Sequence, residues 1–458
     1  IESFFFWLTP ETYFFVSRAL TNNYAEIFMG RIGASSFRKV SNYRPELVVM
    51  GDNMAAHLEG GNILSLQIKP LKDTDKGTNH SSRTVRQLSD FSKQGFDVIK
   101  WLRYSRDNGK FMFCARPAGS PWRYVYQFDP ATQELTQLSN EDTYNGQWLQ
   151  RGNGYAYVGN TNNSFFLAVR PGEAKTATNL FLNGSVVNYT VAPDGDHIFV
   201  TAALGVEPQG LWEYSLTNRA LRRVREGTDD PFKACRIIEP TEYRVTSPDG
   251  VRVPCFLFTP DHRKSGLFTR KTPAVVFLPP ATGQFKRSFD ARAELLANLG
   301  FYFLAVNYRG CDGYGREYSQ LGSASGAAQD ILAALNDLLS RVPDVDRKRI
   351  FLSSSSDGSA LAYELLAEAP ERWRAVVMES PTAPPMARLN AGELPPIFFA
   401  TGDQDGAFRS LMEFQQWGNQ GGADIRSITL TNSGHITYKS NQRKEKLEKV
   451  SRFILERL

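Results

Sequence analysis

The pattern of apolar and polar residues changes near residue 242 of the chain. Before that point, short runs alternate between apolar and polar positions and are bounded by Gly, Pro, Asn or Asp. Alternation with a period of two predicts β-strands that are joined by tight turns. Such strands are expected over Tyr13–Val16, Phe111–Cys114, Tyr124–Phe128, Tyr155–Val158, Phe165–Val169, His197–Thr201 and Leu211–Tyr214. The first part of the chain is therefore expected to be all-β.

Polar turns recur at regular intervals in this all-β part. Turns at 105–110, 150–154 and 192–196 each precede a strand, and their first residues lie 45 and 42 positions apart. A repeat of about 40–45 residues that holds four strands is typical of a β-propeller blade. Further units starting near Leu8 and Asp52 bring the expectation to about five blades over residues 1–242. The polar stretch Pro70–Gln94 is expected to be a long loop, and an array of β-sandwiches is the alternative architecture.

After residue 242, apolar strands alternate with amphipathic helices. Strands are expected over Ala274–Leu278, Phe301–Asn307, Arg349–Ser353, Ala375–Met378, Ile397–Ala400 and Ile425–Thr431, and helices over Ser288–Leu299, Ala327–Ser340, Ser359–Ala369 and Lys444–Leu458. This alternation predicts a mostly parallel, doubly wound sheet with helices on both faces. Residues 243–458 are therefore expected to form an α/β-hydrolase domain, with its chemistry at the carboxyl ends of the strands.

Length, charge and cysteine content narrow the range of functions. With 458 residues the chain suits two or more domains. Its net charge of +5 is spread over both halves, so no nucleic-acid partner is expected. The basic run Lys439–Lys449 is interpreted as the solvated face of a terminal helix. The four cysteines form no CxxC pair, which predicts neither a zinc site nor a disulfide framework, although a bridge between Cys235 and Cys255 stays open. No metal and no cofactor is expected.

The sequence gives little information on the compartment. No apolar run approaches the roughly 20 residues that a membrane span needs, so no membrane span is expected. No secretory signal is visible, since no charged segment precedes an apolar run and a cleavage site. The chain opens at Ile1 rather than Met, which is consistent with a processed or truncated start. The compartment therefore stays open.

A candidate nucleophile follows the expected strand Arg349–Ser353. The next residues read Ser354-Ser355-Ser356-Asp357-Gly358, and a helix is expected to follow. A strand-to-helix turn of this kind is a nucleophile elbow when it reads Gly-x-Ser-x-Gly. Such a sharp turn exposes the serine oxygen at the N-terminus of a helix, which favours developing negative charge. Ser356 is therefore the candidate nucleophile.

The serine needs a base, and the base needs a carboxylate. His435 is the only histidine after Ser356, and it lies between the last expected strand and the last expected helix. The order serine, acid, histidine is that of α/β-hydrolases. The acid must then follow the strand Ile397–Ala400, where Asp403 and Asp405 are both available to orient the imidazole. We select Asp405 and keep Asp403 as the alternative.

At this point the sequence resembles the prolyl oligopeptidase family of serine peptidases, including its acylaminoacyl-peptidase and dipeptidyl-peptidase-like branches. The run Asn307–Glu317 is similar to the family's Asn-Tyr-Arg-Gly-x-x-Gly-Tyr-Gly motif, and Asp330 follows on the next helix. Gly402–Asp405 matches the family's Gly-x-x-Asp, and Gly434-His435 matches its Gly-His. The resemblance implies hydrolysis of short peptides or acyl-amino acids by Ser356, His435 and Asp405, with the propeller limiting access.

The elbow and the oxyanion site depart from the family pattern. Ser354 and Ser359 stand where the family usually has glycine, and Asp357 replaces an aromatic residue beside the nucleophile. The family carries His-Gly-Gly-Pro or a tyrosine after the strand Ala274–Leu278, whereas this chain has Pro279-Pro280, and proline has no N–H to donate. The backbone N–H of Asp357, the N–H of Ala281 and the hydroxyl of Thr282 are the candidate oxyanion donors.

Three functions stay open. The first is a serine peptidase that acts on short peptides or N-acylated aminoacyl substrates. The second is an esterase-like serine hydrolase. The third is a catalytically impaired homologue that binds a partner, which the altered elbow favours and the retained order Ser356, Asp405, His435 opposes. The expected partner is a small peptide or acyl-aminoacyl substrate, and a homo-oligomer stays open.

Overall fold

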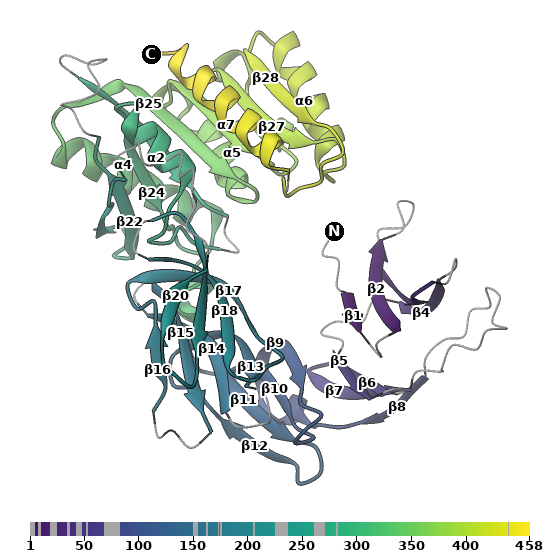
Figure 1. Ribbon diagram of the computed structural model, residues 1–458. Coiled ribbons are helices and arrows are strands. Elements are labelled where there is room, and N and C mark those ends of the chain that lie inside the picture. The colour runs from purple at the N-terminus through teal and green to yellow at the C-terminus, as the bar shows by residue number, and fades with distance from the viewer. Residues whose placement is uncertain are drawn as a thin grey trace. The chain divides into compact units, whose positions relative to one another are not determined.

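The chain folds into two compact units (Figure 1). One contains residues 1–202 and 210–226, and the other residues 203–209 and 227–458. The computed structural model describes residues 5–7, 11–18, 25–33, 37–42, 48–51, 54–67, 83–149, 154–161, 164–172, 174, 176–204, 207–224, 237–260, 271–280, 283–437 and 439–458.

The described part of the first unit is built from five successive groups of four strands. The first four groups are β1 (Phe5–Trp7), β2 (Thr12–Arg18), β3 (Ala25–Arg31) and β4 (Arg38–Asn42); β5 (Val48–Gly51), β6 (Met54–Glu59), β7 (Asn62–Gln67) and β8 (Arg83–Gln87); β9 (Phe96–Tyr104), β10 (Phe111–Pro117), β11 (Tyr124–Asp129) and β12 (Glu134–Gln137); and β13 (Asp142–Trp148), β14 (Gly154–Thr161), β15 (Ser164–Pro171) and β16 (Thr178–Leu180). The fifth group is β17 (Gly184–Val191), β18 (His197–Leu204), β19 (Gly210–Ser215) and β20 (Leu221–Arg223). Within each group the strands follow the chain order, as in the blades of a propeller.

Alternating side chains pack the second to the fifth groups together in sequence. Along β10, Phe111 and Phe113 join a core with the group β5–β8, whereas Met112 and Cys114 join a core with β14 and β15. This follows from the period of two, which sends neighbouring side chains to opposite faces of a strand. A further core joins the fourth and fifth groups. The alternation seen in the sequence therefore serves two apolar faces, one on each side of a blade.

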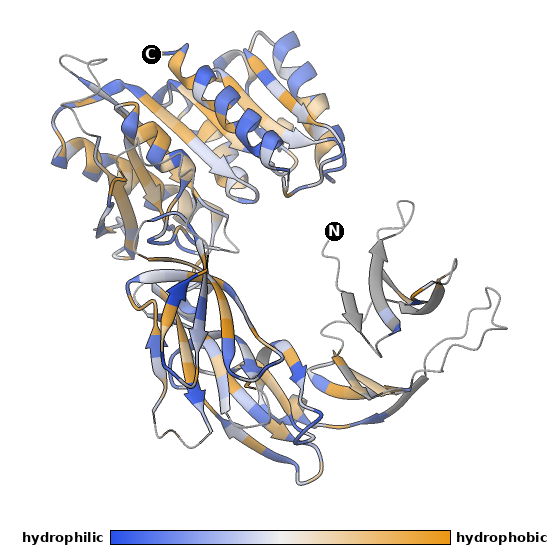
Figure 2. Cartoon of the chain, viewed as in Figure 1, coloured by the Kyte–Doolittle hydropathy of each residue, from blue (hydrophilic) through white to orange (hydrophobic). Residues whose placement is uncertain are grey.

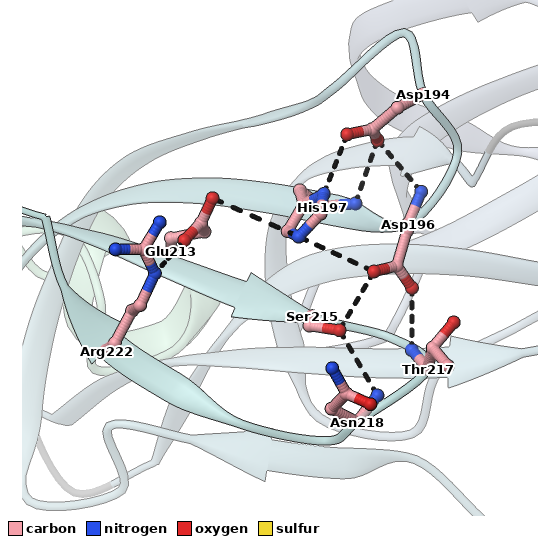
Figure 3. A network of polar contacts seen from close by, with 8 residues as sticks. All are labelled: Asp194, Asp196, His197, Glu213, Ser215, Thr217, Asn218 and Arg222. Atoms are coloured by element: carbon pink, nitrogen blue, oxygen red, sulfur yellow. Dashed lines mark hydrogen bonds and ion pairs between the residues drawn. The ribbon is translucent and has the colours of Figure 1, made fainter.

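The recurring polar turns are closed by side chains of Asp and Asn. In the turn before β18, Oδ1 of Asp194 accepts hydrogen bonds from the N–H groups of Asp196 and His197, at 2.9 and 3.0 Å (Figure 3). In the turn before β10, Oδ1 of Asn108 accepts one from Lys110 N at 3.0 Å. Such bonds replace backbone hydrogen bonds within a tight turn, which is why these residue types recur there.

One expectation for this unit is wrong, and others lie outside the described residues. The stretch Pro70–Gln94 is not a loop throughout, because β8 and a 3₁₀ turn at Phe91–Gln94 lie within it. The strand β8 pairs with β7 and completes the second group, so its polar residues reflect an edge strand. Residues 68–82, 150–153, Leu8 and Asp52 lie outside the described residues.

The second unit contains an eight-stranded sheet flanked by helices. Its strands, in spatial order, are β21 (Thr241–Thr246), β22 (Arg252–Phe258), β24 (Tyr302–Val306), β23 (Thr272–Leu278), β25 (Val345–Ser355), β26 (Ala375–Glu379), β27 (Ile397–Gly402) and β28 (Ile425–Leu430). Its helices are α2 (Ala291–Asn298), α3 (Arg316–Gln320), α4 (Ala324–Arg341), α5 (Gly358–Glu368), α6 (Phe408–Gln420) and α7 (Ser440–Leu455). The neighbouring strands β24, β23, β25, β26, β27 and β28 all pair in parallel. At the other edge, β21 pairs antiparallel with β22, and β22 pairs antiparallel with β24.

Two apolar cores cover the faces of this sheet. One face packs against α4, α5 and α6, and the other packs against α2 and α7. The parallel strands are buried on both sides, which explains why they read as continuous apolar runs (Figure 2). The carboxyl ends of β25, β26 and β27 lie side by side because these strands are neighbours, so the loops that follow them meet at one edge of the sheet.

Four strands and helices of this unit, namely β21, β22, α3 and α6, were not expected from the sequence. The hairpin β21–β22 precedes the alternation of strands and helices, and Pro254 inside β22 weakens its strand signal. Helix α6 was also missed, although Leu411, Phe414 and Gly418 are buried at helical spacing. The boundary expected at residues 242 and 243 stays a prediction. No helix in the described ranges is long and apolar enough to cross a membrane.

The cysteines among the described residues are free and buried. They are Cys114, Cys255 and Cys311, whereas Cys235 lies outside the described residues. Burial raises the pKa of Cys114 to about 12, so this thiol stays protonated near neutral pH. None of the described clusters of His, Cys, Asp and Glu could hold a metal ion.

Candidate active site

Ser356 lies in a strained turn between β25 and α5. Its φ of 53° is in the left-handed region, which a residue other than glycine seldom adopts. Its N–H donates to the carbonyl of Glu379 on the neighbouring strand, at 2.9 Å, and its carbonyl accepts from the N–H of Ser359 at 3.0 Å. The strain and the two bonds together are the features of a nucleophile elbow, which lifts the serine oxygen above the edge of the sheet.

The glycine that the elbow retains is required by the strand beside it. A Cβ atom at Gly358 would lie 2.5 Å from the carbonyl oxygen of Pro279 and 2.9 Å from that of Leu278. Only glycine allows α5 to begin this close to the end of β23. At the two altered positions, Ser354 and Ser359 are both fully buried. The elbow therefore accommodates two serine side chains where the family has none.

The structure brings the three residues selected from the sequence into one chain of contacts. The Oγ of Ser356 lies 2.6 Å from Nε2 of His435, and Nδ1 of the same ring lies 2.8 Å from Oδ2 of Asp405. The Asp405 side chain is 4% exposed, whereas that of His435 is 45% exposed. A carboxylate accepts but does not donate, so the Nδ1 proton points to Asp405 and Nε2 faces the serine hydroxyl.

Asp403, the alternative acid, has a different partner. Its carboxylate accepts from the N–H groups of Asn432 and Ser433, at 3.0 and 3.2 Å. These residues lie in the loop between β28 and α7 that carries His435. Asp403 therefore holds the backbone of the loop, and Asp405 contacts the imidazole.

Two further contacts fix the loop that carries His435. A Cβ atom at Gly402 would lie 2.0 Å from the carbonyl oxygen of Ser433, so the loop passes directly over the end of β27. Ser380, after β26, donates from its Oγ to the carbonyl of His435 at 2.7 Å. The loop of His435 is thus tied to the ends of β26 and β27, and β26 borders β25, the strand that leads to Ser356.

The candidate oxyanion site is only partly described. Asp357 directly follows Ser356, so its N–H belongs to the peptide that joins the two residues. Its backbone angles are helical, at the start of α5. The facing residue Pro279 has no N–H, and its carbonyl accepts a hydrogen bond from the hydroxyl of Tyr308 at 2.8 Å. Burial raises the pKa of Tyr308, and the negative charge of Asp357 contributes in the same direction. Ala281 and Thr282 lie outside the described residues.

A partly buried cluster of charges surrounds Glu379, whose backbone contacts Ser356. The carboxylate of Glu379 contacts Arg292 at 3.1 Å and Lys446 at 2.6 Å, and Arg292 also pairs with Asp290 at 3.1 Å. Burial alone would raise the pKa of Glu379, but the charges of Arg292 and Lys446 lower it below its usual range. Since the carbonyl of Glu379 accepts from Ser356 N, this cluster anchors the strand end on which the nucleophile rests.

Lys446 also corrects one interpretation of the sequence. The basic run does lie largely on a terminal helix, α7, but its face is not wholly solvated. The Lys446 side chain is 18% exposed, whereas that of Lys444 is 78% exposed. The pairing with Glu379 therefore draws one lysine of this run inward.

The motif that begins at Asn307 forms the support of a loop. Arg309 contacts Asp330 through Nη2 at 2.6 Å and through Nε at 2.9 Å, and it also pairs with Asp249. Arg309 and Asp330 are 5% and 0% exposed. The guanidinium lowers the pKa of the Asp249 carboxyl to about 2. Arg309 therefore binds carboxylates of this unit, as expected for a residue that supports the loop.

Comparison with known proteins extends these observations. Residues 287–391, which include Ser356, match the model of the prolyl oligopeptidase family. A segment of 118 residues is 30% identical to acylamino-acid-releasing enzyme 2 of Oryza sativa subsp. japonica. This match covers 25% of the chain and spans 15% of that enzyme's own length. The resemblance to the prolyl oligopeptidase family is confirmed.

Solved structures show the fold over nearly the whole chain. A puromycin-hydrolyzing peptidase of Mycobacterium tuberculosis aligns over 98% of this chain and 77% of its own, with a TM-score of 0.76 and 15% identity. An acylaminoacyl peptidase of Pyrococcus horikoshii aligns over 97% of this chain and 79% of its own, with a TM-score of 0.70 and 14% identity. The expected fold, a β-propeller with an α/β-hydrolase domain, is confirmed, and the β-sandwich alternative is not needed.

Several supporting residues of the site were missed from the sequence. Ser359 was noted only as a departure from the prolyl oligopeptidase pattern, and Ser380 and Thr382 were not singled out. Their contacts join segments that are 23 and 55 residues apart, and short serine- and threonine-containing runs give no signal of such pairing. The one available signal is position, since Ser380 directly follows a strand that borders the nucleophile strand.

Proposed function

We propose that this chain is a serine peptidase that hydrolyses short peptides or N-acylated aminoacyl substrates through an acyl-enzyme intermediate. The observation that carries the proposal is the contact of 2.6 Å between Ser356 Oγ and His435 Nε2, with Asp405 at 2.8 Å behind the ring. A serine hydroxyl is a poor nucleophile unless an adjacent base removes its proton. Here His435 Nε2 faces the serine hydroxyl, and the buried carboxylate of Asp405 orients the ring through Nδ1.

The proposed reaction uses each of the three side chains in turn. His435 Nε2 takes the proton as Ser356 Oγ attacks the substrate carbonyl carbon, and Asp405 stabilises the imidazolium that results. The C–N bond then breaks as the imidazolium gives its proton to the leaving amine. A water molecule, activated by the same imidazole, attacks the acyl-enzyme and releases the acid.

The oxyanion of this reaction would be held by the N–H of Asp357 and by a second donor from Ala281 or Thr282. Loss of one oxyanion donor typically costs ~10²–10³ in rate. With Pro279 in place of a donor, and with the carboxylate of Asp357 close by, the expected rates are low. The proposed substrate class rests on the resemblance to the prolyl oligopeptidase family and on the names of the relatives. We also propose that the propeller limits access to the site.

A fluorophosphonate probe tests the proposal directly. We expect the purified protein to be labelled at Ser356, and expect both Ser356→Ala and His435→Ala to abolish labelling. Peptides of increasing length, N-acylated aminoacyl amides and matched esters then define the substrate class. Failure of the purified wild-type protein to label would show that the proposal is wrong.

The altered elbow favours a second candidate, an impaired homologue that binds a peptide without cleaving it. Ser354, Ser359 and Pro279 all depart from the family pattern. Such a protein would bind a substrate peptide in calorimetry, but neither label nor release product. An esterase-like hydrolase is distinguished by turnover of esters without turnover of the matched amides.

A further inference from the structure

Ser359 contacts the nucleophile's own carbonyl. Its Oγ lies 2.6 Å from the carbonyl oxygen of Ser356, 2.8 Å from Thr382 N and 3.0 Å from Thr382 Oγ1. Ser359 is fully buried. The hydroxyl therefore joins the elbow to the loop after β26 and is shielded from solvent.

The roles in this cluster follow from what each atom can donate. A carbonyl oxygen only accepts, and a backbone N–H only donates, so the single proton of the Ser359 hydroxyl goes to the carbonyl of Ser356. The N–H and the hydroxyl of Thr382 supply the two hydrogen bonds that Ser359 Oγ accepts. The hydroxyl thus donates one hydrogen bond and accepts two, and these three bonds fix the rotamer of Ser359.

The carbonyl of Ser356 belongs to the same peptide as the N–H of Asp357. In a planar trans peptide these two groups point in opposite directions. The carbonyl is held by two donors, the N–H of Ser359 at 3.0 Å and its hydroxyl at 2.6 Å. Holding the carbonyl therefore fixes the direction of the Asp357 N–H on the other side.

We propose that Ser359 is a positioning residue that aims the Asp357 N–H at the substrate oxyanion. This inference rests on the proposed function, because it assigns a role within that reaction. The family has glycine here and a second donor where this chain has Pro279, so the hydroxyl acts on the proposed donor of this chain, the N–H of Asp357. A hydrogen bond to a carbonyl also polarises the peptide and makes its N–H a stronger donor.

Thr382, which contacts the Ser359 hydroxyl, offers a second substitution that tests the proposal. Its carbonyl accepts from the hydroxyl of Tyr363 on α5, at 3.3 Å, so the loop is held to the helix at two places. Removal of the Thr382 hydroxyl leaves its N–H bond to Ser359 in place. Thr382→Val is therefore expected to have a smaller effect than Ser359→Ala.

The experiment compares the rate constant for fluorophosphonate labelling in the wild type, Ser359→Ala, Ser359→Gly and Thr382→Val. We expect Ser359→Ala to be about 10- to 100-fold slower, as for other small displacements of catalytic geometry. Ser359→Gly restores the residue that the family carries, so its backbone fits the elbow even where alanine impairs folding. Both variants lack the hydroxyl and should be slow.

A thiono ester separates positioning from a merely structural role. Sulfur accepts hydrogen bonds poorly, so the wild type should lose its advantage over Ser359→Ala on the thiono analogue of a p-nitrophenyl ester. The deficit of the variant should be in kcat, with KM little changed, and should shrink to about 2-fold or less on the thiono ester. Ser323→Ala, which removes the cap of α4, is the matched control for lost stability without lost rate.

The outcomes are distinguishable. Equal labelling of wild type and Ser359→Ala, or an equal deficit on both esters, overturns the role of Ser359 and leaves the peptidase proposal intact. An unlabelled wild type overturns both.

Discussion

Ser380 donates a hydrogen bond of 2.7 Å from its Oγ to the backbone carbonyl of His435. Its φ of 44° is left-handed, and its N–H donates to the carbonyl of Ala400 at 2.7 Å. The residue before it, Glu379, accepts from the N–H of Ser356. Glu379, the last residue of β26, and Ser380, directly after it, thus contact Ser356 and His435 and set the distance between them.

Loss of the Ser380 hydroxyl should weaken this link. We expect Ser380→Ala to label about 10-fold more slowly with a fluorophosphonate, because the imidazole is then less well positioned. Ser380→Gly suits the left-handed backbone better but also lacks the hydroxyl, so it should be equally slow while more stable than the alanine variant. Wild-type rates in both variants would exclude the role of this hydroxyl.

The two aspartates after β27 should respond differently to conservative substitution. Asp405→Asn loses the charge that favours the correct tautomer of His435, and the expected loss in kcat is ~10⁴-fold. Asp403→Asn retains one oxygen that can accept from the loop, so it should keep more activity than Asp403→Ala. The assignment is checked by dividing the labelling rate of the asparagine variant by that of the alanine variant at each of the two positions. A larger loss in Asp403→Asn than in Asp405→Asn would reverse it.

Gly402 should not tolerate a side chain. Alanine would bring its Cβ to 2.0 Å from the carbonyl oxygen of Ser433, which is backbone and cannot move without shifting the loop of His435. We expect Gly402→Ala to lose labelling and to unfold at a lower temperature. Gly406→Ala is the matched control, since nothing lies within 4 Å of a Cβ there. Similar behaviour of the two variants would contradict the close approach.

The charge of Lys446 should stabilise the protein at neutral pH, and this contribution should be lost in acid. The pKa of Glu379 is below its usual range in the folded state, so its contribution to stability is present above the unfolded pKa and is lost as the pH falls through the folded pKa. Lys446→Met removes one of its two cations and should cost about 1–3 kcal/mol, with acid unfolding shifted to higher pH. Lys444→Met, on the exposed face of α7, should change neither quantity in urea and acid titrations.

The three residues of the candidate site that were selected from the sequence are those whose position depends on the order of elements along the chain. Ser356, Asp405 and His435 each follow or precede an element whose period is visible, and the order of α/β-hydrolases then assigns them. Ser359 and Ser380 could not be found in this way, since their roles depend on hydrogen bonds between loops. The strand β8 was missed because edge strands carry polar residues, and the turn chemistry around Asp194 was found because asparagine and aspartate act within a few residues of their own position.

His197, in the last described blade, should make stability depend on pH. Its Nδ1 lies 2.7 Å from Asp194, and its Nε2 lies 3.5 Å from Asp196 and 4.0 Å from Glu213, which is itself paired with Arg222 (Figure 3). The hydrogen bond to Asp194 and the charges of all three carboxylates raise the pKa of His197 above its usual value.

The direction of the effect follows from these shifts. Because the folded pKa of His197 is raised, its contribution is complete below the unfolded pKa of ~6.5 and is lost as the pH rises through the folded pKa. The pKa of Asp194 is lowered to about 2, chiefly by the N–H of Asp196, so Asp194 stays ionised across that interval. We expect His197→Gln to lower Tm at about pH 5.5 and to have little effect at about pH 8.5. In an Asp194→Asn background the difference at low pH should largely vanish, and a deficit independent of pH would instead mean that the ring acts by packing alone.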